Sequence, residues 1–384
     1  MRNLGKVYNS LFTAAVHISP LVLRKYSFHT DHLPEINEPF LMLANHTTEL
    51  DFLMASCAAG VPMRFVLGEH LLRGHLGSLL QRIANPIAVP KGASSVPAVK
   101  EILHRLRQGD NILLFPEGSR SFHGETVPQN SSLGKLVKLS GAALVTYRIQ
   151  GGYFVAPRWA SYTRVGPMEG HVVHVYSSEK LGSMTASEIA DNINSDLHEN
   201  AYDTQQLRAH RYKGKALAEG LENYLIICPH CGGYDSLVSE GDRFHCKLCG
   251  LQGVYDEYGF LQGRDLDYHS VYDWGKWIEK RFDTDVSRRN ADELLFTEND
   301  IRLYRIDAVV HNIQSYKTAS LKIFRNRFEI GDYSLTRKTI SEMAMLYYGK
   351  SLLLKSKEGY VGMTGPTVHG WKTDRLYRLE KAGS

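Results

Sequence analysis

The stretch of sequence that decides the fold is residues 39–59, Pro-Phe-Leu-Met-Leu-Ala-Asn-His-Thr-Thr-Glu-Leu-Asp-Phe-Leu-Met-Ala-Ser-Cys-Ala-Ala. Residues 40–44 are apolar without alternation, which is typical of a strand buried on both faces of a sheet. The pattern then favours a helix from about Thr48 to Ala59. Further along, a helix is expected over 96–108 and an apolar strand over 111–115. Strands that alternate with helices predict an α/β layer fold.

The composition is that of an ordinary globular protein. The 384 residues are 43% hydrophobic and 22% charged, which excludes disordered and fibrous classes. At about 100–200 residues per domain, the length indicates two or three domains. The net charge of +4 is unevenly distributed, because residues 60–165 hold 13 Lys or Arg against 5 Asp or Glu. This basic region suits a phosphorylated ligand, coenzyme A or an anionic bilayer, although an ordinary solvated surface would explain most of these side chains individually.

His46 and Asp51 form the first candidate pair for chemistry. Five residues along a continuous helix correspond to about 500°, so the two side chains would not share a face. They meet only if His46 lies in the loop after the strand and Asp51 lies in the first helical turn. Asp51 would then orient the imidazole, whose other nitrogen could accept a proton. The alternative is a helix cap, because Thr48 and Asp51 have capping-box spacing.

The second candidate segment is Phe115-Pro-Glu-Gly-Ser-Arg-Ser121, directly after the apolar strand. Ligands bind at the strand ends of such sheets. Pro116 and Gly118 favour a tight turn from which Glu117 and Arg120 project, suited to a hydroxyl and a phosphate respectively. The alternative is an ordinary turn with a surface ion pair.

These two motifs, in this order, resemble those of the glycerolipid acyltransferase family, of which the 1-acylglycerol-3-phosphate acyltransferases are the best known. The resemblance covers roughly residues 35–200 and implies an acyltransferase-type mixed sheet flanked by helices. It makes His46 the general base and Asp51 its orienting partner. It also implies an acceptor site, whose expected residues are Lys91, Glu117, Gly118, Ser119 and Arg120.

Three departures from the family pattern bear on the acceptor. Ser119 stands where the third motif usually has Thr, and Lys91 where the second has Arg. Thr146 replaces a Pro in the apolar strand expected over 142–149. The segment 153–159 that follows is expected to be extended and is not part of the common pattern.

The resemblance implies transfer of a fatty acyl group from a thioester donor to the hydroxyl of a lysophospholipid, most simply lysophosphatidic acid to phosphatidic acid. The donor is acyl-coenzyme A or acyl carrier protein, and the latter would then be a partner. The expected location is cytoplasmic, peripheral on the inner face of an anionic membrane. The alternative function is a non-catalytic lipid-binding or adaptor protein that keeps an acyltransferase fold. No nucleic acid partner is expected.

Four of the five cysteines predict a structural zinc ribbon. Cys228-Pro-His-Cys231 and Cys246-Lys-Leu-Cys249 are two CxxC knuckles separated by 14 residues, each followed by Gly. Four thiolates at this spacing bind tetrahedral zinc and leave no open position for catalysis. His230 or His245 could substitute as a ligand. The ribbon has few basic residues, which argues against nucleic acid.

The chain is expected to consist of four regions. In order, they are an N-terminal helix over residues 1–30, an acyltransferase domain over 31–215, the ribbon over 216–262 and a mostly-β domain over 263–384. The last domain resembles in pattern PH-like or GRAM-like barrels, with serial short strands (293–296, 300–304, 321–324, 327–330, 343–348, 351–355 and 360–363) and one helix over 372–379. The N-terminal helix is amphipathic and either packs on its own domain or lies in an anionic membrane surface. Its apolar stripe is Leu4, Val7, Leu11, Phe12, Ala15 and Ile18, and its basic flanks are Arg2, Lys6, Arg24 and Lys25.

Overall fold

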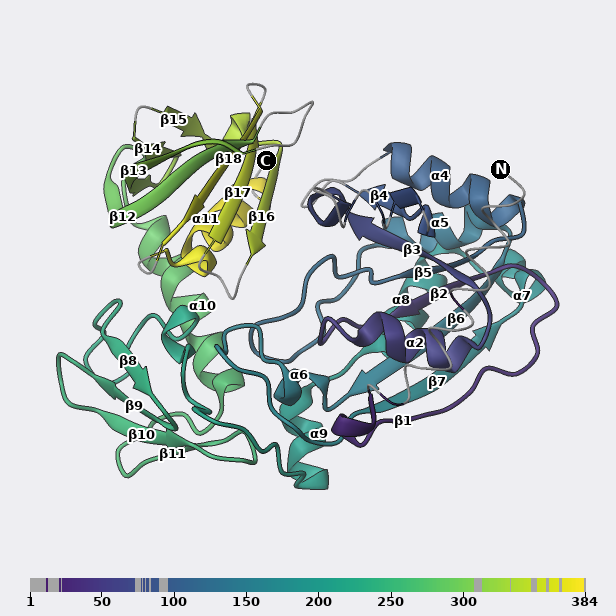
Figure 1. Cartoon of the computed structure of the whole chain (residues 1–384), viewed down its shortest axis with the longest axis horizontal. Helices are drawn as coiled ribbons and strands as arrows, with labels where there is room; N and C mark the ends of the chain where they lie inside the picture. Colours follow the sequence, from purple (N-terminus) through teal and green to yellow (C-terminus); the bar gives the residue numbers. More distant parts are fainter. Residues whose placement is uncertain are drawn as a thin grey trace. The chain divides into compact units, whose positions relative to one another are not determined.

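The computed structural model describes two compact units of the chain (Figure 1). The first contains residues 1–90, 94–157 and 163–214, and the second contains 91–93, 158–162 and 215–384. The residues that the structure describes are 12, 21, 23–72, 77, 79, 81, 82, 84–89, 96–306, 313–331, 333–346, 351–356, 359–365 and 368–382. Lys91 and most of the expected N-terminal helix lie outside these residues. Phe12 of that helix is described, and it is buried with its ring centroid 6.3 Å from that of Phe65.

The first unit is built on a seven-stranded mixed sheet of order β1-β7-β6-β2-β5-β3-β4. Neighbours from β6 to β4 are parallel, whereas β7 runs antiparallel to β6 and parallel to β1. The mixed sheet expected from the sequence is therefore confirmed. Its strands are β1 (His29–Thr30), β2 (Phe40–Ala44), β3 (Met63–Gly68), β4 (Ile87–Val89), β5 (Asn111–Leu114), β6 (Ala143–Gln150) and β7 (Glu169–Tyr176).

Helices cover both faces of this sheet (Figure 1). Leu41 and Leu43 of β2 pack in one core cluster with side chains of α4, α5 and α8. Phe40 and Met42, which alternate with them, are buried on the opposite face, where α2 lies. Burial on both faces explains the continuous apolar sequence of β2. The helices of this unit are α2 (Asp51–Ala59), α4 (Val96–Arg107), α5 (Ser131–Ser140), α6 (Gly152–Val155), α7 (Ser178–Ser183), α8 (Ala186–Leu197) and α9 (Ala201–Arg208).

The register of the central strands brings the two motif loops together. β2 and β5 are parallel neighbours with Leu43 opposite Leu114, so both strands end at the same edge of the sheet. The loop after β2 carries His46, and the loop after β5 carries Glu117 and Arg120. Sheet order thus places two segments about 70 positions apart in the sequence beside each other.

The segment expected to be extended over 153–159 is not a strand, and that expectation was wrong. Gly151 has φ 77° at the end of β6, and the chain then forms α6. All four residues of α6 are buried. A short apolar run buried on all sides has the same composition as a core strand, so periodicity cannot separate the two.

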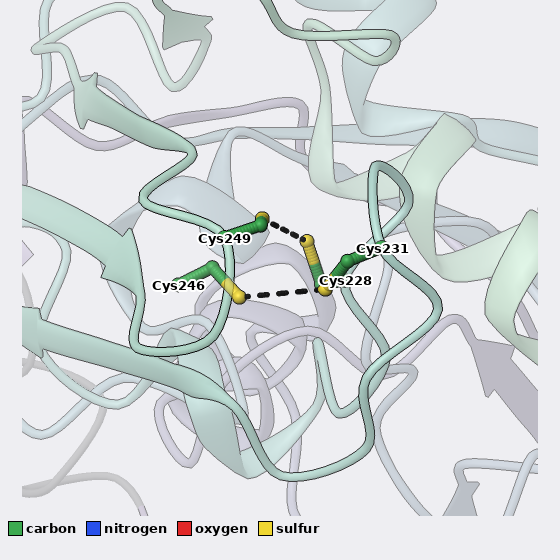
Figure 2. A group of neighbouring side chains, drawn as sticks. All are labelled: Cys228, Cys231, Cys246 and Cys249. Atoms are coloured by element: carbon green, nitrogen blue, oxygen red, sulfur yellow. Dashed lines mark hydrogen bonds between the residues drawn. The ribbon is translucent and has the colours of Figure 1, made fainter.

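The second unit begins with the ribbon, a four-stranded antiparallel sheet of order β11-β10-β9-β8. Its strands are β8 (Leu237–Glu240), β9 (Arg243–Cys246), β10 (Gln252–Tyr255) and β11 (Leu261–Gln262). Cys228 and Cys231 precede β8, Cys246 ends β9, and Cys249 lies in the turn to β10. Figure 2 shows the four side chains pointing toward one another.

The rest of the second unit is mostly β, as expected. Seven antiparallel strands form one sheet of order β15-β14-β13-β12-β18-β17-β16, which is two meanders joined through β12 and β18. The strands expected over 293–296 and 300–304 are one strand, because Asn299-Asp300 forms an irregularity inside β12 rather than a turn between strands. The elements are α10 (Val271–Ser287), β12 (Leu294–Ile306), β13 (Ile313–Phe324), β14 (Arg327–Ile330), β15 (Tyr333–Thr336), β16 (Glu342–Leu346), β17 (Ser351–Ser356), β18 (Gly359–Thr364) and α11 (Gly370–Ala382).

Helix α10 joins the ribbon to this second sheet. Trp274 is fully buried and donates a hydrogen bond from Nε1 to the carbonyl oxygen of Ile227, 3.0 Å away, just before the first knuckle. Further along the helix, Phe282 stacks on Phe296 of β12 and meets Trp371 of α11 edge-on. The ribbon and the seven-stranded sheet are therefore packed against the same helix.

Candidate active site and metal centre

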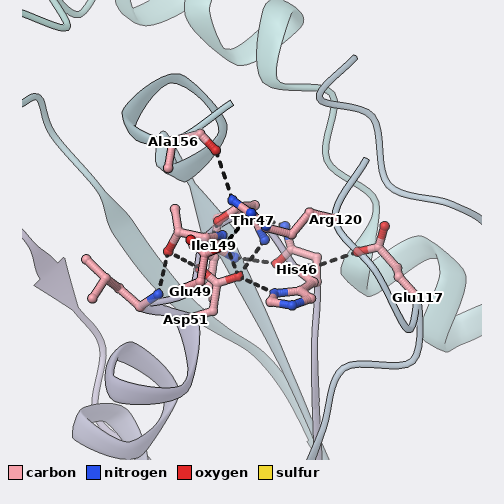
Figure 3. A network of polar contacts seen from close by, with 11 residues as sticks. His46, Thr47, Glu49, Asp51, Glu117, Arg120, Ile149 and Ala156 are labelled. Carbon is pink, nitrogen blue, oxygen red and sulfur yellow. Dashed lines mark hydrogen bonds and ion pairs between the residues drawn. The ribbon is translucent and has the colours of Figure 1, made fainter. Parts of the chain in front are cut away.

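His46 and Asp51 meet in the loop between β2 and α2. His46 Nδ1 lies 2.9 Å from Asp51 Oδ2 (Figure 3). The Asp51 side chain is fully buried, whereas the His46 side chain is 25% exposed. With a carboxylate as acceptor, Nδ1 carries the proton and Nε2 is the nitrogen that can take one from a substrate. The ring also stacks on Phe115, 4.7 Å between centroids, which restricts its rotation.

Asp51 accepts hydrogen bonds from the whole turn that holds His46. The backbone N–H and hydroxyl of Thr47 both donate to it, and so do those of Thr48. The residue at the N-cap of α2 is Leu50 and no side chain caps the helix, so the structure does not bear out the capping box expected of Thr48 and Asp51. The sequence pattern assigned Thr48 only the capping role and Thr47 none, although two hydroxyl residues directly after the histidine were a usable signal.

Glu117 connects three loops through its carboxylate. Its Oε1 accepts the backbone N–H of His46 at 2.8 Å, and its Oε2 accepts that of Val127 at 3.1 Å. Burial raises the pKa of this carboxyl to about 7, against the lowering effect of both hydrogen bonds. Gly118, with φ 66°, and Ser119 form the turn that separates Glu117 from Arg120. The geometry makes Glu117 a positioning residue for the His46 backbone.

Arg120 links the second motif to the first. Its Nη1 donates to the carbonyl oxygen of Ala156 at 3.1 Å, and its Nη2 donates to Glu49 Oε1 at 2.5 Å. Glu49 belongs to the His46–Asp51 loop, so Arg120 joins the two motifs (Figure 3). The other expected anion ligand, Lys91, lies outside the described residues.

Two further residues that sequence reasoning missed support the loop. Asn45 donates to the carbonyl oxygen of Ile149 and accepts from its backbone N–H, at 2.9 and 2.7 Å, which ties the end of β2 to β6. Gly152 of α6 lies against Thr47, because a Cβ at this position would be 2.1 Å from Thr47 Oγ1. The Gly-Gly pair at 151–152 was the available signal, since glycine often marks a close backbone approach.

His46 borders a small hollow that opens to solvent. Its walls come from both motif loops and from α6, and it is lined by Asn45, His46, Thr47, Glu117, Ser121, Gly124, Glu125, Thr126 and Tyr153. A proton acceptor at the wall of a pocket is the arrangement that general-base chemistry requires.

Thr146, which stands in place of a family Pro, is fully buried in β6. Its hydroxyl donates to Asp196 Oδ2 of α8 at 2.9 Å. Because β6 pairs with β2 on one side and β7 on the other, a residue with a backbone N–H suits this interior strand. The Thr at position 146 is therefore explained by its contacts inside the sheet and with α8.

The four ribbon cysteines form a group that fits a tetrahedral metal. Their sulfur atoms all lie within 4.8 Å of one another. Cys228 Sγ is 3.7 Å from Cys249 Sγ, and Cys231 Sγ is 3.8 Å from Cys246 Sγ. Zn–S bonds of about 2.3 Å in a tetrahedron separate the sulfurs by about 3.8 Å.

The local backbone of the knuckles supports this fit. Gly232 and Gly250 have φ of 71° and 76°, and their N–H groups close turns onto the carbonyl oxygens of Cys228 and Cys246. Ser236 Oγ lies 3.3 Å from Cys246 Sγ and can support that ligand. Among the described residues, the group that gathers here contains neither His230 nor His245.

Within the part of the chain that the structure describes, no helix has both the length and the apolar character needed to cross a membrane.

Comparison with known proteins bears on the first unit. Residues 25–150, which include both motif loops, match the sequence model of the acyltransferase family. None of the curated proteins matches the chain. Among solved structures, the chain is similar to the 1-acyl-sn-glycerophosphate (LPA) acyltransferase PlsC from Thermotoga maritima, at 17% identity and a TM-score of 0.45, over 56% of this chain and 86% of that one. Residues 25–150 thus form a domain of the acyltransferase family.

Proposed function

We propose that this protein is a membrane-surface O-acyltransferase that moves a fatty acyl group from a thioester donor to the hydroxyl of a lysophospholipid, most simply lysophosphatidic acid. The observation that carries the proposal is the 2.9 Å contact between His46 Nδ1 and Asp51 Oδ2, inside a family-matched domain and at the wall of a pocket. It leaves His46 Nε2 available as a base at the wall of this solvent-open hollow.

In the proposed reaction, His46 Nε2 takes the proton of the acceptor hydroxyl as its oxygen attacks the thioester carbonyl. The tetrahedral intermediate collapses with cleavage of the C–S bond, and the ester remains on the acceptor. The imidazolium then returns its proton to the departing sulfur. Asp51 stabilises the transient positive charge on the ring, as in a hydrolase triad, but no protein nucleophile is needed.

The remaining assignments follow from charge and chemistry. Arg120 and Lys91 bind the acceptor phosphate, and Glu117, Gly118 and Ser119 shape the turn that presents Arg120. The thioester is carried by coenzyme A or acyl carrier protein. Residues 31–215 are the catalytic domain, and the zinc held by Cys228, Cys231, Cys246 and Cys249 clamps the ribbon before the mostly-β region. An anionic inner membrane face is the proposed location.

The proposal is tested by an acyl-transfer assay with the full-length protein. The two donors are coenzyme A and acyl carrier protein, each carrying a radiolabelled acyl thioester. Each donor is offered on mixed vesicles with lysophosphatidic acid, lysophosphatidylethanolamine, lysophosphatidylcholine and monoacylglycerol. Product that depends on both donor and acceptor supports the proposal. Tight vesicle binding without transfer to any acceptor would favour the lipid-binding alternative.

A further inference from the structure

We propose that Glu49 sets the charge selectivity of the acceptor site by occupying the anion-binding face of Arg120, so that an acceptor phosphate must displace it. This inference rests on the proposed function and concerns the same site. It starts from the ion pair between Arg120 Nη2 and Glu49 Oε1, 2.5 Å apart.

Glu49 and Ala156, which both accept hydrogen bonds from Arg120, differ in how easily they can be replaced. The Ala156 carbonyl that accepts from Nη1 follows α6 and belongs to a buried residue. The Arg120 side chain is only 15% exposed, whereas the Glu49 side chain is 73% exposed. The guanidinium is therefore fixed in place, and the carboxylate is the partner that can swing into solvent. An incoming phosphate oxygen would make the same charge-assisted bond to Nη2.

The position of Glu49 in the chain ties this exchange to the chemistry. Glu49 lies between Thr48 and Asp51, in a loop whose backbone and hydroxyl donors converge on the Asp51 carboxylate. Those bonds hold the loop without any contribution from the Glu49 side chain, so Glu49 can leave Arg120 while the loop stays in place. A phosphate that takes its position is held beside the loop that carries the base.

Competition by an internal carboxylate has a measurable consequence. Replacing Glu49 with Gln keeps the side-chain shape but removes the charge that competes with phosphate. Because a partly exposed ion pair contributes little, the KM for a phosphorylated acceptor should fall by about two- to fivefold relative to an uncharged acceptor. The loss of Arg120 should have the opposite effect on the same ratio.

The experiment compares wild type, Glu49→Gln and Glu179→Gln, the last removing an equal charge from an exposed position on α7. The KM ratio of lysophosphatidic acid to monoacylglycerol with the same acyl chain is measured for each, and a thermal melt checks the fold. A lower ratio in Glu49→Gln alone is the expected result. An unchanged ratio, or an equal fall in Glu179→Gln, would overturn the proposal.

Two more measurements separate the remaining outcomes. If Glu49→Gln instead raises the KM for lysophosphatidylethanolamine only, Glu49 binds an ammonium group and the competition proposal is wrong. Binding of sn-glycerol 3-phosphate, followed by titration calorimetry, needs no turnover. If wild type transfers to no acceptor, the proposed function fails, and the calorimetry alone decides: tighter binding by Glu49→Gln supports the role of Glu49, and equal binding overturns it.

Discussion

In the first unit, Asp51 directs both carboxylate oxygens to its own loop, while His46 lies at the wall of a pocket. In the second unit, four cysteines also come from two turns, but all four sulfurs face one another within 4.8 Å. Both clusters are built from short loops at strand ends. In the first cluster only one of the two ring nitrogens of His46 contacts Asp51, whereas in the second all four sulfurs belong to the group.

The difference shows that a cluster of polar side chains can serve either to orient a reactive group or to hold the backbone together. A base needs an orienting partner that is itself immobile, and Asp51 is immobile because five hydrogen bonds hold it. A closed site of four cysteines has no position for substrate, so a metal bound by such a site would act only by holding the backbone. The predictions below test this contrast, from the largest expected effect to the smallest.

Removal of zinc is expected to have the largest effect, and on the second unit only. Structural zinc sites contribute about 10–16 kcal/mol to the folding of small metal-dependent peptides, so the ribbon should unfold without metal. Elemental analysis should find one zinc per chain in the wild type and none in Cys246→Ser. The same variant should also lose the protection of the ribbon amides from hydrogen exchange. Cys57→Ser, in α2 of the first unit, is the control and should keep the metal. Native protection in zinc-free protein would refute the closed-site assignment.

His46→Ala should reduce acyl transfer by about 10²–10⁴ without changing zinc content or the melting temperature. Asp51→Asn should lose a comparable activity but also lose stability, because its amide group would face N–H and hydroxyl donors that now bind a carboxylate. Steady-state rates beside thermal melts distinguish the two variants. Near wild-type turnover by a folded His46→Ala protein would remove His46 from the chemistry.

The raised pKa of Glu298 predicts that the stability of the second unit, to which Glu298 belongs, depends on pH. Burial raises its pKa to about 7 from 4.5, despite Lys372 Nζ at 3.6 Å and with a further raising effect from Asp235. A carboxyl whose folded pKa is raised binds its proton more tightly in the folded state, so stability falls as pH rises from about 4.5 to 7.

At about 1.36 kcal/mol per pKa unit, the loss for Glu298 is roughly 3 kcal/mol. Urea unfolding at several pH values should show this slope in wild type and not in Glu298→Gln. Identical slopes in the two proteins would contradict the assignment. Because Glu117 has a raised pKa of about 7 as well, Glu117→Gln should flatten the corresponding slope of the first unit.

Gly152→Ala should lower the transfer rate by up to about 10²-fold, the loss expected from a displacement near 1 Å in an active-site loop. Its Cβ would overlap Thr47 Oγ1, which donates to Asp51. Gly182→Ala is the matched control, because a Cβ there meets nothing within 4 Å. If both variants have wild-type rates, α6 does not brace the loop.

Much of the architecture could be predicted from local pattern. The amphipathic α4 was expected at nearly its observed bounds, because burial of one helix face imposes a period on the sequence. The continuous apolar runs of β2 and β5 were also expected near their observed bounds, because they have the length of a strand buried on both faces. Thr185 and Glu188 have the spacing of a capping box, and that box is present at the start of α8. By contrast, α6 was mistaken for a strand, since four consecutive buried apolar residues carry no period.

In the candidate site, too, some features could be predicted from the local sequence and others could not. The spacing of His46 and Asp51 and of the two CxxC knuckles is local. The sequence alone therefore determined which side chains could act as a general base with its orienting carboxylate, and which could act as metal ligands. The partners of Glu117 and Arg120 lie 71 positions away in the sequence, at His46 and Glu49. Only the parallel pairing of β2 with β5 brings those loops together, and only the turn into α6 places Gly152 and Ala156 against them. The tertiary structure therefore decided the direction of each charged side chain, because its hydrogen-bond partners are supplied by strands that the order of the sheet, and not the local sequence, makes into neighbours.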